Sequence, residues 1–314
     1  MSVGRNALSI NMIQNLSKSY TLKCKFFILN FLISIIFCTF VAKLIDMRMN
    51  SSNCHWVIPK KLYKYYSINK RLYDVIKSGS CWFSRPSDFN DPFDCNLDVS
   101  IGNGEREIMN NIEKSSMLQL LKEELSNRSS EVKGAGERIL SKPSFVKKII
   151  NEVHKYYINQ NIGVYCLSED PLNILMWSHY ANSHKGICLE FDIKRDGFFY
   201  NNLLPVQYRK RYPKFELSDY QDEENMMFAM HQQAICTKSI LWKYEKEWRV
   251  ITDDGCGLKK FDKQDITRVI FGANISDNDK KRILSLFKAN EYTAVKYCQC
   301  QLSEHKYSLE ICDI

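Results

Sequence analysis

The stretch Trp242-Lys243-Tyr244-Glu245-Lys246-Glu247-Trp248-Arg249 decides how the rest of the chain is interpreted. Its residues alternate as in a β-strand, where side chains two positions apart point the same way. Glu245, Glu247 and Arg249 would then share one face. Two carboxylates and a guanidinium in a row cost free energy when they are buried without partners. The row is therefore either part of a functional site or the solvated face of an edge strand, where charges discourage aggregation.

Outward from this stretch, short apolar runs separated by turn residues predict further strands. The strand patterns are residues 61–67, 80–84, 163–168, 186–191, 206–208, 247–252, 266–271, 293–298 and 307–312. Helical patterns cover 69–77, 173–180, 219–238 and 276–289, the last with Ser276 as its cap and Asp279 three residues on. Strands and helices do not alternate regularly. The sequence therefore predicts an α+β fold with a mixed, mostly antiparallel sheet and helical insertions.

The chain is expected to contain one α+β domain over residues 50–314. Apolar residues recur near the helical period between 104 and 160, so this region is predicted to be a helical insertion in that domain.

The first 49 residues form a basic leader. Residues 26–42 contain no charge, and lysines flank them on both sides, which is the short limit for a membrane-spanning helix. One interpretation is a hydrophobic N-terminal helix that anchors a cytoplasmic main domain to a membrane. The other is a misassigned start, with translation beginning at Met47 or Met49.

The net charge of +8 is unevenly distributed, because the leader carries +5 and the remainder only +3. A general nucleic-acid-binding protein is not indicated by this balance. Twelve cysteines occur without a CxxC pair, so no zinc site is predicted and reduced thiols are expected.

Two further polar stretches are candidates for chemistry. Trp177-Ser178-His179-Tyr180 places a ring, a hydroxyl, an imidazole and a phenol in succession, which could stack on a base and hydrogen-bond its edge. In the loop at 85–93, Asn90 and Asp91 either form a structural turn or cover a site, and Arg85 could bind a phosphate. No Gly-rich phosphate loop is present.

The order of these motifs resembles a known family. Lys64-Tyr65, Phe83-Ser84-Arg85-Pro86, Phe89–Phe93, Met176–Tyr180, His184-Lys185-Gly186, Glu190-Phe191-Asp192, Lys238 and Trp242–Arg249 follow one another along residues 60–312. This order is similar to that of the bacterial "domain of unknown function 2971" family. The resemblance implies no established activity.

A weaker resemblance is to the ADP-ribosyltransferase arrangement of three spaced elements. It implies NAD as the cofactor, with Lys64 or Tyr65 on the first strand, Ser84 or the Trp177–Tyr180 region second, and Glu247 or Glu245 on a late strand. The chain departs from that arrangement because no Arg or His occupies the first strand.

These patterns lead to one hypothesis and two rivals. The hypothesis is a cleft for a nucleotide-like small molecule, with Glu247 as the essential acid, Glu245 and His179 assisting it, and an unknown macromolecular acceptor. The ligand-binding residues are predicted to be Lys64, Tyr65, Ser84, Arg85, Asn90, Asp91, Trp177, Tyr180 and Arg249. The rivals are a non-catalytic sensing or interaction module in phage or stress defence, and a metal-dependent nuclease using Asp91 and the Glu pair.

Overall fold

The computed structural model describes residues 56–100, 143–195, 197–216 and 223–314. Residues 1–55 lie outside this part of the chain, and so do the predicted anchor at 26–42 and residues 104–142 of the predicted insertion. Within the described ranges, no helix is both long and apolar enough to cross a bilayer.

The described chain divides into two compact units. Residues 99–100, 143–157, 216 and 223–226 belong to the first, and the remaining described residues belong to the second. The described residues 143–157 of the expected helical insertion thus fall in the first unit, where they form most of helix α7 (Pro143–Asn161). The single domain over 50–314 stays a prediction.

In the described part of the second unit, one eight-stranded sheet dominates, with the strand order β14-β13-β12-β5-β1-β4-β10-β6. Its strands are β1 (Lys61–Tyr66), β4 (Gly163–Ser168), β5 (Ile187–Asp192), β6 (Leu203–Pro205), β10 (Glu247–Thr252), β12 (Ile266–Phe271), β13 (Lys296–Leu302) and β14 (Leu309–Asp313). Every neighbouring pair is antiparallel except β12 and β13, which are parallel. This confirms the α+β class with a mixed, mostly antiparallel sheet.

Shorter elements complete the described chain. The remaining strands are β2 (Ser80–Phe83), β3 (Asp98–Ser100), β7 (Gln207–Arg209), β8 (Lys214–Glu216), β9 (Thr237–Ser239) and β11 (Gly257–Lys260). The helices besides α7 are α3 (Lys70–Ser78), α8 (Ile174–Tyr180), α9 (Glu223–Ile235) and α10 (Asp277–Ala289), with 3-10 turns η2 (Pro86–Asp88), η3 (Tyr200–Asn202), η5 (Ile240–Glu245) and η6 (Lys263–Asp265).

Local sequence explains where several of these helices begin and end. The Asn69 side chain accepts from the Leu72 amide at the start of α3, and Gly79 ends the helix in the left-handed conformation that glycine adopts without strain. Ser276 caps α10 by accepting from the Asp279 amide, as its sequence predicts.

The sheet separates two apolar clusters. On β5, Ile187, Leu189 and Phe191 pack into the larger cluster, whereas Cys188 packs into the smaller one. Successive strand residues point to opposite faces, so this division follows from the pleat.

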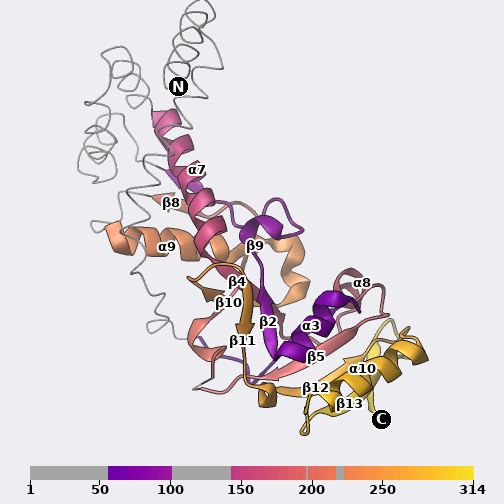
Figure 1. Ribbon diagram of the computed structural model, residues 1–314. Helices are drawn as coiled ribbons and strands as arrows, with labels where there is room; N and C mark the ends of the chain where they lie inside the picture. The colour runs from indigo at the N-terminus through magenta and orange to yellow at the C-terminus, as the bar shows by residue number, and fades with distance from the viewer. Residues whose placement is uncertain (1–55, 101–142, 196, 217–222) are drawn as a thin grey trace, which may run out of the picture. The chain divides into compact units, whose positions relative to one another are not determined.

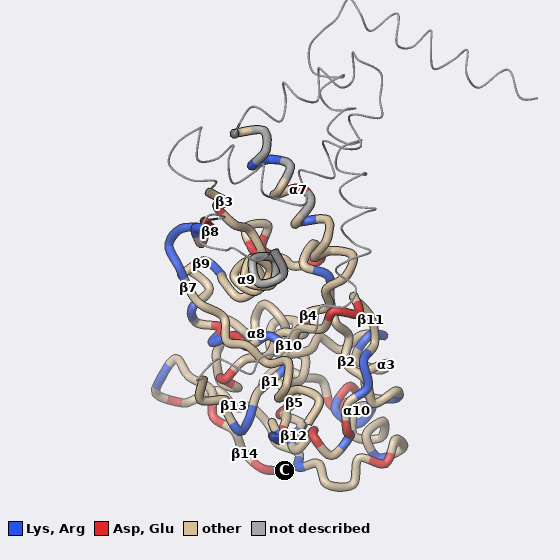
Figure 2. The backbone as a smooth tube through the Cα atoms, turned by 90° about the vertical axis from the view of Figure 1, so that its left-hand side faces the viewer, with Lys and Arg blue, Asp and Glu red and all other residues tan. Residues whose placement is uncertain are grey.

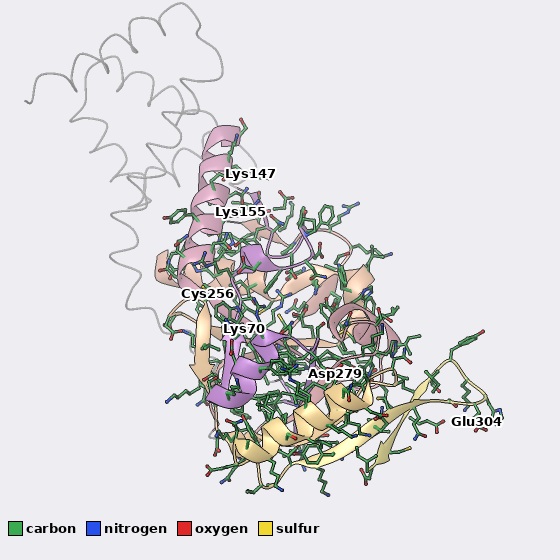
Figure 3. The ribbon with its side chains drawn as sticks, turned by 45° about the vertical axis from the view of Figure 1, so that its right-hand side comes forward. Lys70, Lys147, Lys155, Cys256, Asp279 and Glu304 are labelled. Carbon is green, nitrogen blue, oxygen red and sulfur yellow. The ribbon has the colours of Figure 1, made fainter. Side chains whose placement is uncertain are left out.

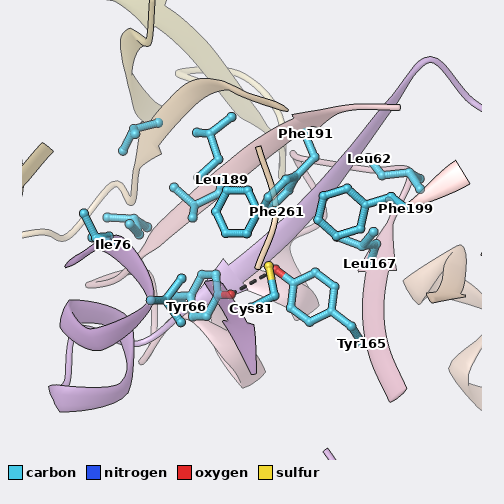
Figure 4. Packing of buried hydrophobic residues seen from close by; sticks show 14 of the residues in the cluster. Leu62, Tyr66, Ile76, Cys81, Tyr165, Leu167, Leu189, Phe191, Phe199 and Phe261 are labelled. Carbon is cyan, nitrogen blue, oxygen red and sulfur yellow. Dashed lines mark hydrogen bonds between the residues drawn. The ribbon is translucent and has the colours of Figure 1, made fainter. Parts of the chain in front are cut away.

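Helices cover the two faces of the sheet differently. The larger cluster contains residues of α3 and α10, which lie side by side (Figure 1), and Figure 4 shows its aromatic rings packed around Leu189 and Phe261. The smaller cluster contains residues of α8. The β13–β14 hairpin carries Glu304 in its turn and extends past α10 (Figure 3).

Candidate functional site

A gap in the sheet creates the candidate site. Strand β1 pairs with β5 along all six residues and β4 pairs with β10 along all six, but β1 and β4 share only the pair Tyr63 and Ser168. Beyond that pair the two strands separate. Lys64 spans the separation, because its Nζ donates to the main-chain oxygen of Cys166 at 2.7 Å.

A cavity of about 310 Å³ opens at this gap. It is lined by Tyr63, Lys64, Tyr65, Arg71, Trp82, Ser84, Asp88, Phe89, Asn90, Asp94, Val164, Cys166, Leu167, Ser168, Met176, Tyr180, Lys238, Glu245, Glu247 and Arg249. The lining therefore combines aromatic rings with charges of both signs.

One wall of the cavity is a buried ion cluster, formed by Asp94, Lys238, Glu245, Glu247 and Arg249. Each of these five residues is at most 9% exposed. Three carboxylates face two cations, so the cluster carries a net charge of −1 when all five groups are ionised. Such an arrangement is stable only when nearly every charge has a partner.

Arg249 binds two of the carboxylates with paired hydrogen bonds. Its Nη1 and Nη2 donate to the two Asp94 oxygens at 3.0 and 2.6 Å, and its Nε and Nη2 donate to Glu247 at 2.8 and 3.1 Å. Nη1 also donates to the Ile235 carbonyl, and the guanidinium lies 4.9 Å from the Phe89 ring centre. Planar two-point contacts of this kind fix both position and orientation.

Lys238 joins the remaining carboxylate to the cluster. Its Nζ lies 2.5 Å from Glu245 Oε2, 3.0 Å from Glu247 Oε2 and 3.8 Å from Asp94 Oδ2. The ammonium is also 5.0 Å from the Trp242 ring centre. Lys238 therefore compensates all three acids at once.

The two glutamates differ in their ionisation. Burial raises the pKa of Glu247, but Arg249 and Lys238 outweigh burial and hold that pKa well below its usual range. Burial raises the pKa of Glu245, and Lys238 offsets this only in part while Glu247 adds to it. Glu245 is thus the acid of this pair that protonates more readily.

The main chain that carries these acids differs from the sequence prediction. Residues 240–245 form the 3-10 turn η5 and Lys246 is left-handed with φ of 45°, so the strand-like alternation expected to include Glu245 is wrong, whereas β10 begins at Glu247 as predicted. Glu245 reaches the cluster because the turn redirects the chain, not because of strand alternation. The edge-strand interpretation is also wrong, since β10 lies between β4 and β6.

Tyr180 extends the cluster toward the cavity. Its hydroxyl donates to Glu245 Oε1 at 2.6 Å and accepts from Asn90 Nδ2 at 3.4 Å. Burial, followed by Glu245, raises the pKa of this phenol. Helix α8 holds Tyr180 in place, because Asn173 caps that helix and donates to the Tyr244 carbonyl at 2.9 Å.

The residues that the sequence assigned to a site divide into two groups. Lys64, Tyr65, Ser84, Asn90, Tyr180, Glu245, Glu247 and Arg249 line the cavity. Arg85, Asp91, Trp177 and His179 are absent from its lining.

Each of these four has another environment. Arg85 is exposed and its Nε lies 3.1 Å from Cys256 Sγ, while His179 is exposed among the rings of Trp242 and Tyr244. Trp177 is fully buried in the smaller cluster and donates to the Pro171 carbonyl at 2.8 Å.

Asp91 forms the structural turn that was one of its two interpretations. Its Oδ1 accepts from the Phe93 amide at 2.9 Å.

Sequence reasoning missed Asp94 and Lys238 as site residues. The charges of the 242–249 stretch could have indicated Lys238. Glu245, Glu247 and Arg249 leave one acid without a cation, and Lys238 lies seven residues before Glu245. Asp94 directly follows the 89–93 loop motif, but nothing local indicated its pairing with Arg249.

The acids of the site are not arranged for a metal ion. Across the residues described by the structure, no group of three or more His, Cys, Asp or Glu side chains is positioned to hold one. The carboxylates of the ion cluster instead form ion pairs with Lys238 and Arg249.

Comparison with known proteins identifies one family. Residues 176–250 match the model of the family described as "Protein of unknown function (DUF2971)", which confirms the predicted family resemblance over this segment. The segment contains Tyr180, Lys238 and the acids of η5 and β10, but neither Lys64 nor Asp94. No curated protein and no solved structure matches the chain, and the resemblance to ADP-ribosyltransferases is not supported by these comparisons.

Proposed function

We propose that the cavity is a binding site for a small nucleotide-like ligand. The observation that carries this proposal is that two cations of the lining, Lys64 and Arg71, form no ion pair with a carboxylate of the described residues and lie beside aromatic rings. Phosphate groups form charged hydrogen bonds with such cations, and nucleobases stack on such rings.

The two cations are available for a ligand because the described chain does not neutralise them. Lys64 donates to the Cys166 carbonyl and lies 4.8 Å from the centre of the Tyr165 ring, which leaves further N–H donors. The Arg71 guanidinium lies 5.3 Å from the centre of the Trp82 ring and is solvent-exposed. Each of the two residues can supply a positive charge to an anionic group of the ligand.

Other lining residues offer hydrogen-bonding groups for a neutral, hydroxyl-bearing part of the ligand. Asn90, Tyr180 and Glu245 form a hydrogen-bonded series, in which Glu245 is the acid. A sugar with paired hydroxyls fits the chemistry of a phenol, an amide and a carboxylate.

The volume limits the size of the ligand. A cavity of about 310 Å³ is near the lower end of the roughly 300–1,000 Å³ typical of ligand sites. It suits a single nucleotide better than a dinucleotide such as NAD, whose second half would have to lie outside.

A more specific version of this proposal, called the finer form below, is that the bound ligand is NAD and that the protein transfers ADP-ribose from it. Glu247 was predicted as its essential acid, yet both Glu247 oxygens accept from Arg249, and one also accepts from Lys238. In this form Glu247 fixes the cluster, and Glu245 is the acid that faces the substrate through Tyr180.

The non-catalytic sensing or interaction module also has support from an observation. The ion cluster holds helix α8 through Tyr180 and Glu245, as that interpretation requires. No comparable contact supports the metal-dependent nuclease, because each acid of the cluster faces a cation.

Calorimetric titration of the full chain with adenosine and guanosine monophosphates and with NAD tests the binding proposal. Lys64→Gln should weaken binding about 10–100-fold, since a charged hydrogen bond contributes about 1.5–3 kcal/mol. The matched control is Lys60→Gln, which removes the same charge from an exposed lysine that does not line the cavity. Equal affinities for both variants, or no binding of any nucleotide by the wild type, would refute the proposal.

Incubation with labelled NAD tests the finer form separately. A transferase would label an acceptor or release nicotinamide, and Glu245→Gln would abolish this while the protein stays folded. Tight nucleotide binding with no NAD consumption would leave the binding site and remove the transferase.

A further inference from the structure

A second surface of the same unit carries cations that the ligand cavity does not use. The segment Gln207-Tyr208-Arg209-Lys210-Arg211-Tyr212 runs from strand β7 toward β8, and no acid occurs between residues 197 and 215. Figure 2 shows this run as a continuous basic stretch between β7 and β8. We call Arg209, Lys210, Arg211 and Lys243 of η5, with the exposed Tyr212 and Leu241, the basic face.

The two segments of the basic face are structural neighbours. Strand β7 pairs with β9 in parallel, and Arg209 is the partner of Ser239. Ser239 caps η5 by accepting from the Leu241 amide, so η5 begins directly beside Arg209. The cations of β7 and η5 are therefore brought together by pairing between strands.

The charges of the basic face are not neutralised by the described residues. Arg209 donates only to Gln207 Oε1, at 3.0 Å, and none of the four cations forms an ion pair with a residue that the structure describes. All four side chains are exposed. Clustered like charges repel one another, and a polyanion would relieve that repulsion.

Aromatic and apolar side chains accompany the cations. Tyr212 is 46% exposed and Leu241 is 80% exposed, and Trp242 lies next to Leu241 in η5. Basic residues interleaved with exposed rings are typical of surfaces that track a phosphate backbone while bases stack on the rings. Stacking of this kind requires unpaired bases.

We propose that the basic face binds single-stranded nucleic acid through its phosphates, with Tyr212 as a stacking platform. The face lies beside the cavity wall, because the Tyr208 hydroxyl accepts from the Glu247 amide at 2.7 Å. The inference goes beyond the proposed nucleotide site and does not depend on it. Lys64 variants test the cavity, and variants of the basic face test this surface.

The experiment measures binding of the full chain to fluorescent oligonucleotides of about ten unpaired nucleotides, in RNA and DNA forms, over a range of salt. The triple variant Arg209→Gln, Lys210→Gln, Arg211→Gln is compared with Lys281→Gln, Lys288→Gln, Lys296→Gln. The control removes the same charge from exposed lysines of α10 and β13. Melting temperatures check that both variants fold.

Each phosphate contact adds about 0.7 to the slope of log affinity against log salt for single strands. The slope of the triple variant should therefore be smaller than that of the control by about 2. A fourfold rise in salt should then weaken binding by the control about 20-fold more than binding by the triple variant. Tyr212→Ala should weaken single-strand binding about tenfold without changing the slope.

Three results would overturn the inference. The first is equal affinity and slope for the triple variant and its control. The second is binding of duplex as tight as that of single strands with no effect of Tyr212→Ala. The third is binding to vesicles of anionic lipid with none to oligonucleotides, which would assign the face to a membrane surface. The RNA and DNA arms decide which sugar the strand carries.

Discussion

Removal of Lys238 should destabilise the protein more than removal of any exposed lysine. Lys238 is 6% exposed and is within 4 Å of three carboxylates. In Lys238→Met, three buried acids would share one cation, and the net charge of the ion cluster would change from −1 to −2. Breaking a buried pair by removing one partner costs about 3–5 kcal/mol.

The chain supplies a matched control in Lys246. Its Nζ lies 3.0 Å from Asp170, but its side chain is 54% exposed, so the pair is worth less than about 1 kcal/mol. Lys246→Met is the same substitution eight residues away. In thermal unfolding, Lys238→Met should lower the melting temperature by about 6–20 °C, and Lys246→Met by only a few degrees.

The effect of Lys238→Met should also depend on pH. The folded-state pKa of Glu245 is already above the ordinary value of 4.5, because burial raises it and Lys238 offsets this only in part. Without Lys238 this pKa rises further. A carboxyl whose pKa is raised binds its proton more tightly in the folded protein, so its contribution favours folding at low pH and is lost as pH rises through the folded pKa.

Urea unfolding at several pH values measures both effects. The difference between Lys238→Met and wild type should be smallest near pH 4.5 and should grow as the pH rises. The double variant Lys238→Met, Glu245→Gln restores the wild-type charge of the cluster and should regain part of the lost stability. A difference below about 1 kcal/mol, or one independent of pH, would refute the assignment of Lys238 as the shared counter-ion.

Two further predictions concern the packing around the cavity. Tyr180→Phe removes the donor to Glu245 and should lower the free energy of unfolding by about 1–3 kcal/mol. The control Tyr244→Phe should change that free energy by less than about 0.5 kcal/mol. Urea titrations compare the two variants, and equal values would contradict the role of the Tyr180 hydroxyl. Gly186→Ala would place a Cβ 2.0 Å from the Tyr66 carbonyl oxygen and should lower the free energy of unfolding by at least about 3 kcal/mol. A variant as stable as wild type in the same titration would show that the chain at Gly186 approaches β1 less closely.

Local patterns predicted much of the fold. Strands β4, β10 and β12 have the bounds expected from their apolar and β-branched content, because a strand in the interior of a sheet requires such residues along its whole length. Helix α10 follows its cap and apolar spacing. The 3-10 turn at 240–245 was missed, since alternation over a few residues does not distinguish a strand from a tight turn followed by a left-handed residue.

The candidate site shows the boundary between sequence and tertiary structure most clearly. The amino-acid pattern alone predicts that Glu245, Glu247 and Arg249 need partners, because charges in a strand-rich, apolar segment cannot be buried alone. The three-dimensional fold shows that Asp94, which is 155 residues from Arg249, and Lys238 are those partners, and that Tyr180 rather than Trp177 lines the cavity. The reason is physical: charge compensation and the separation of β1 from β4 arise from contacts between distant segments, and local periodicity carries no record of such contacts.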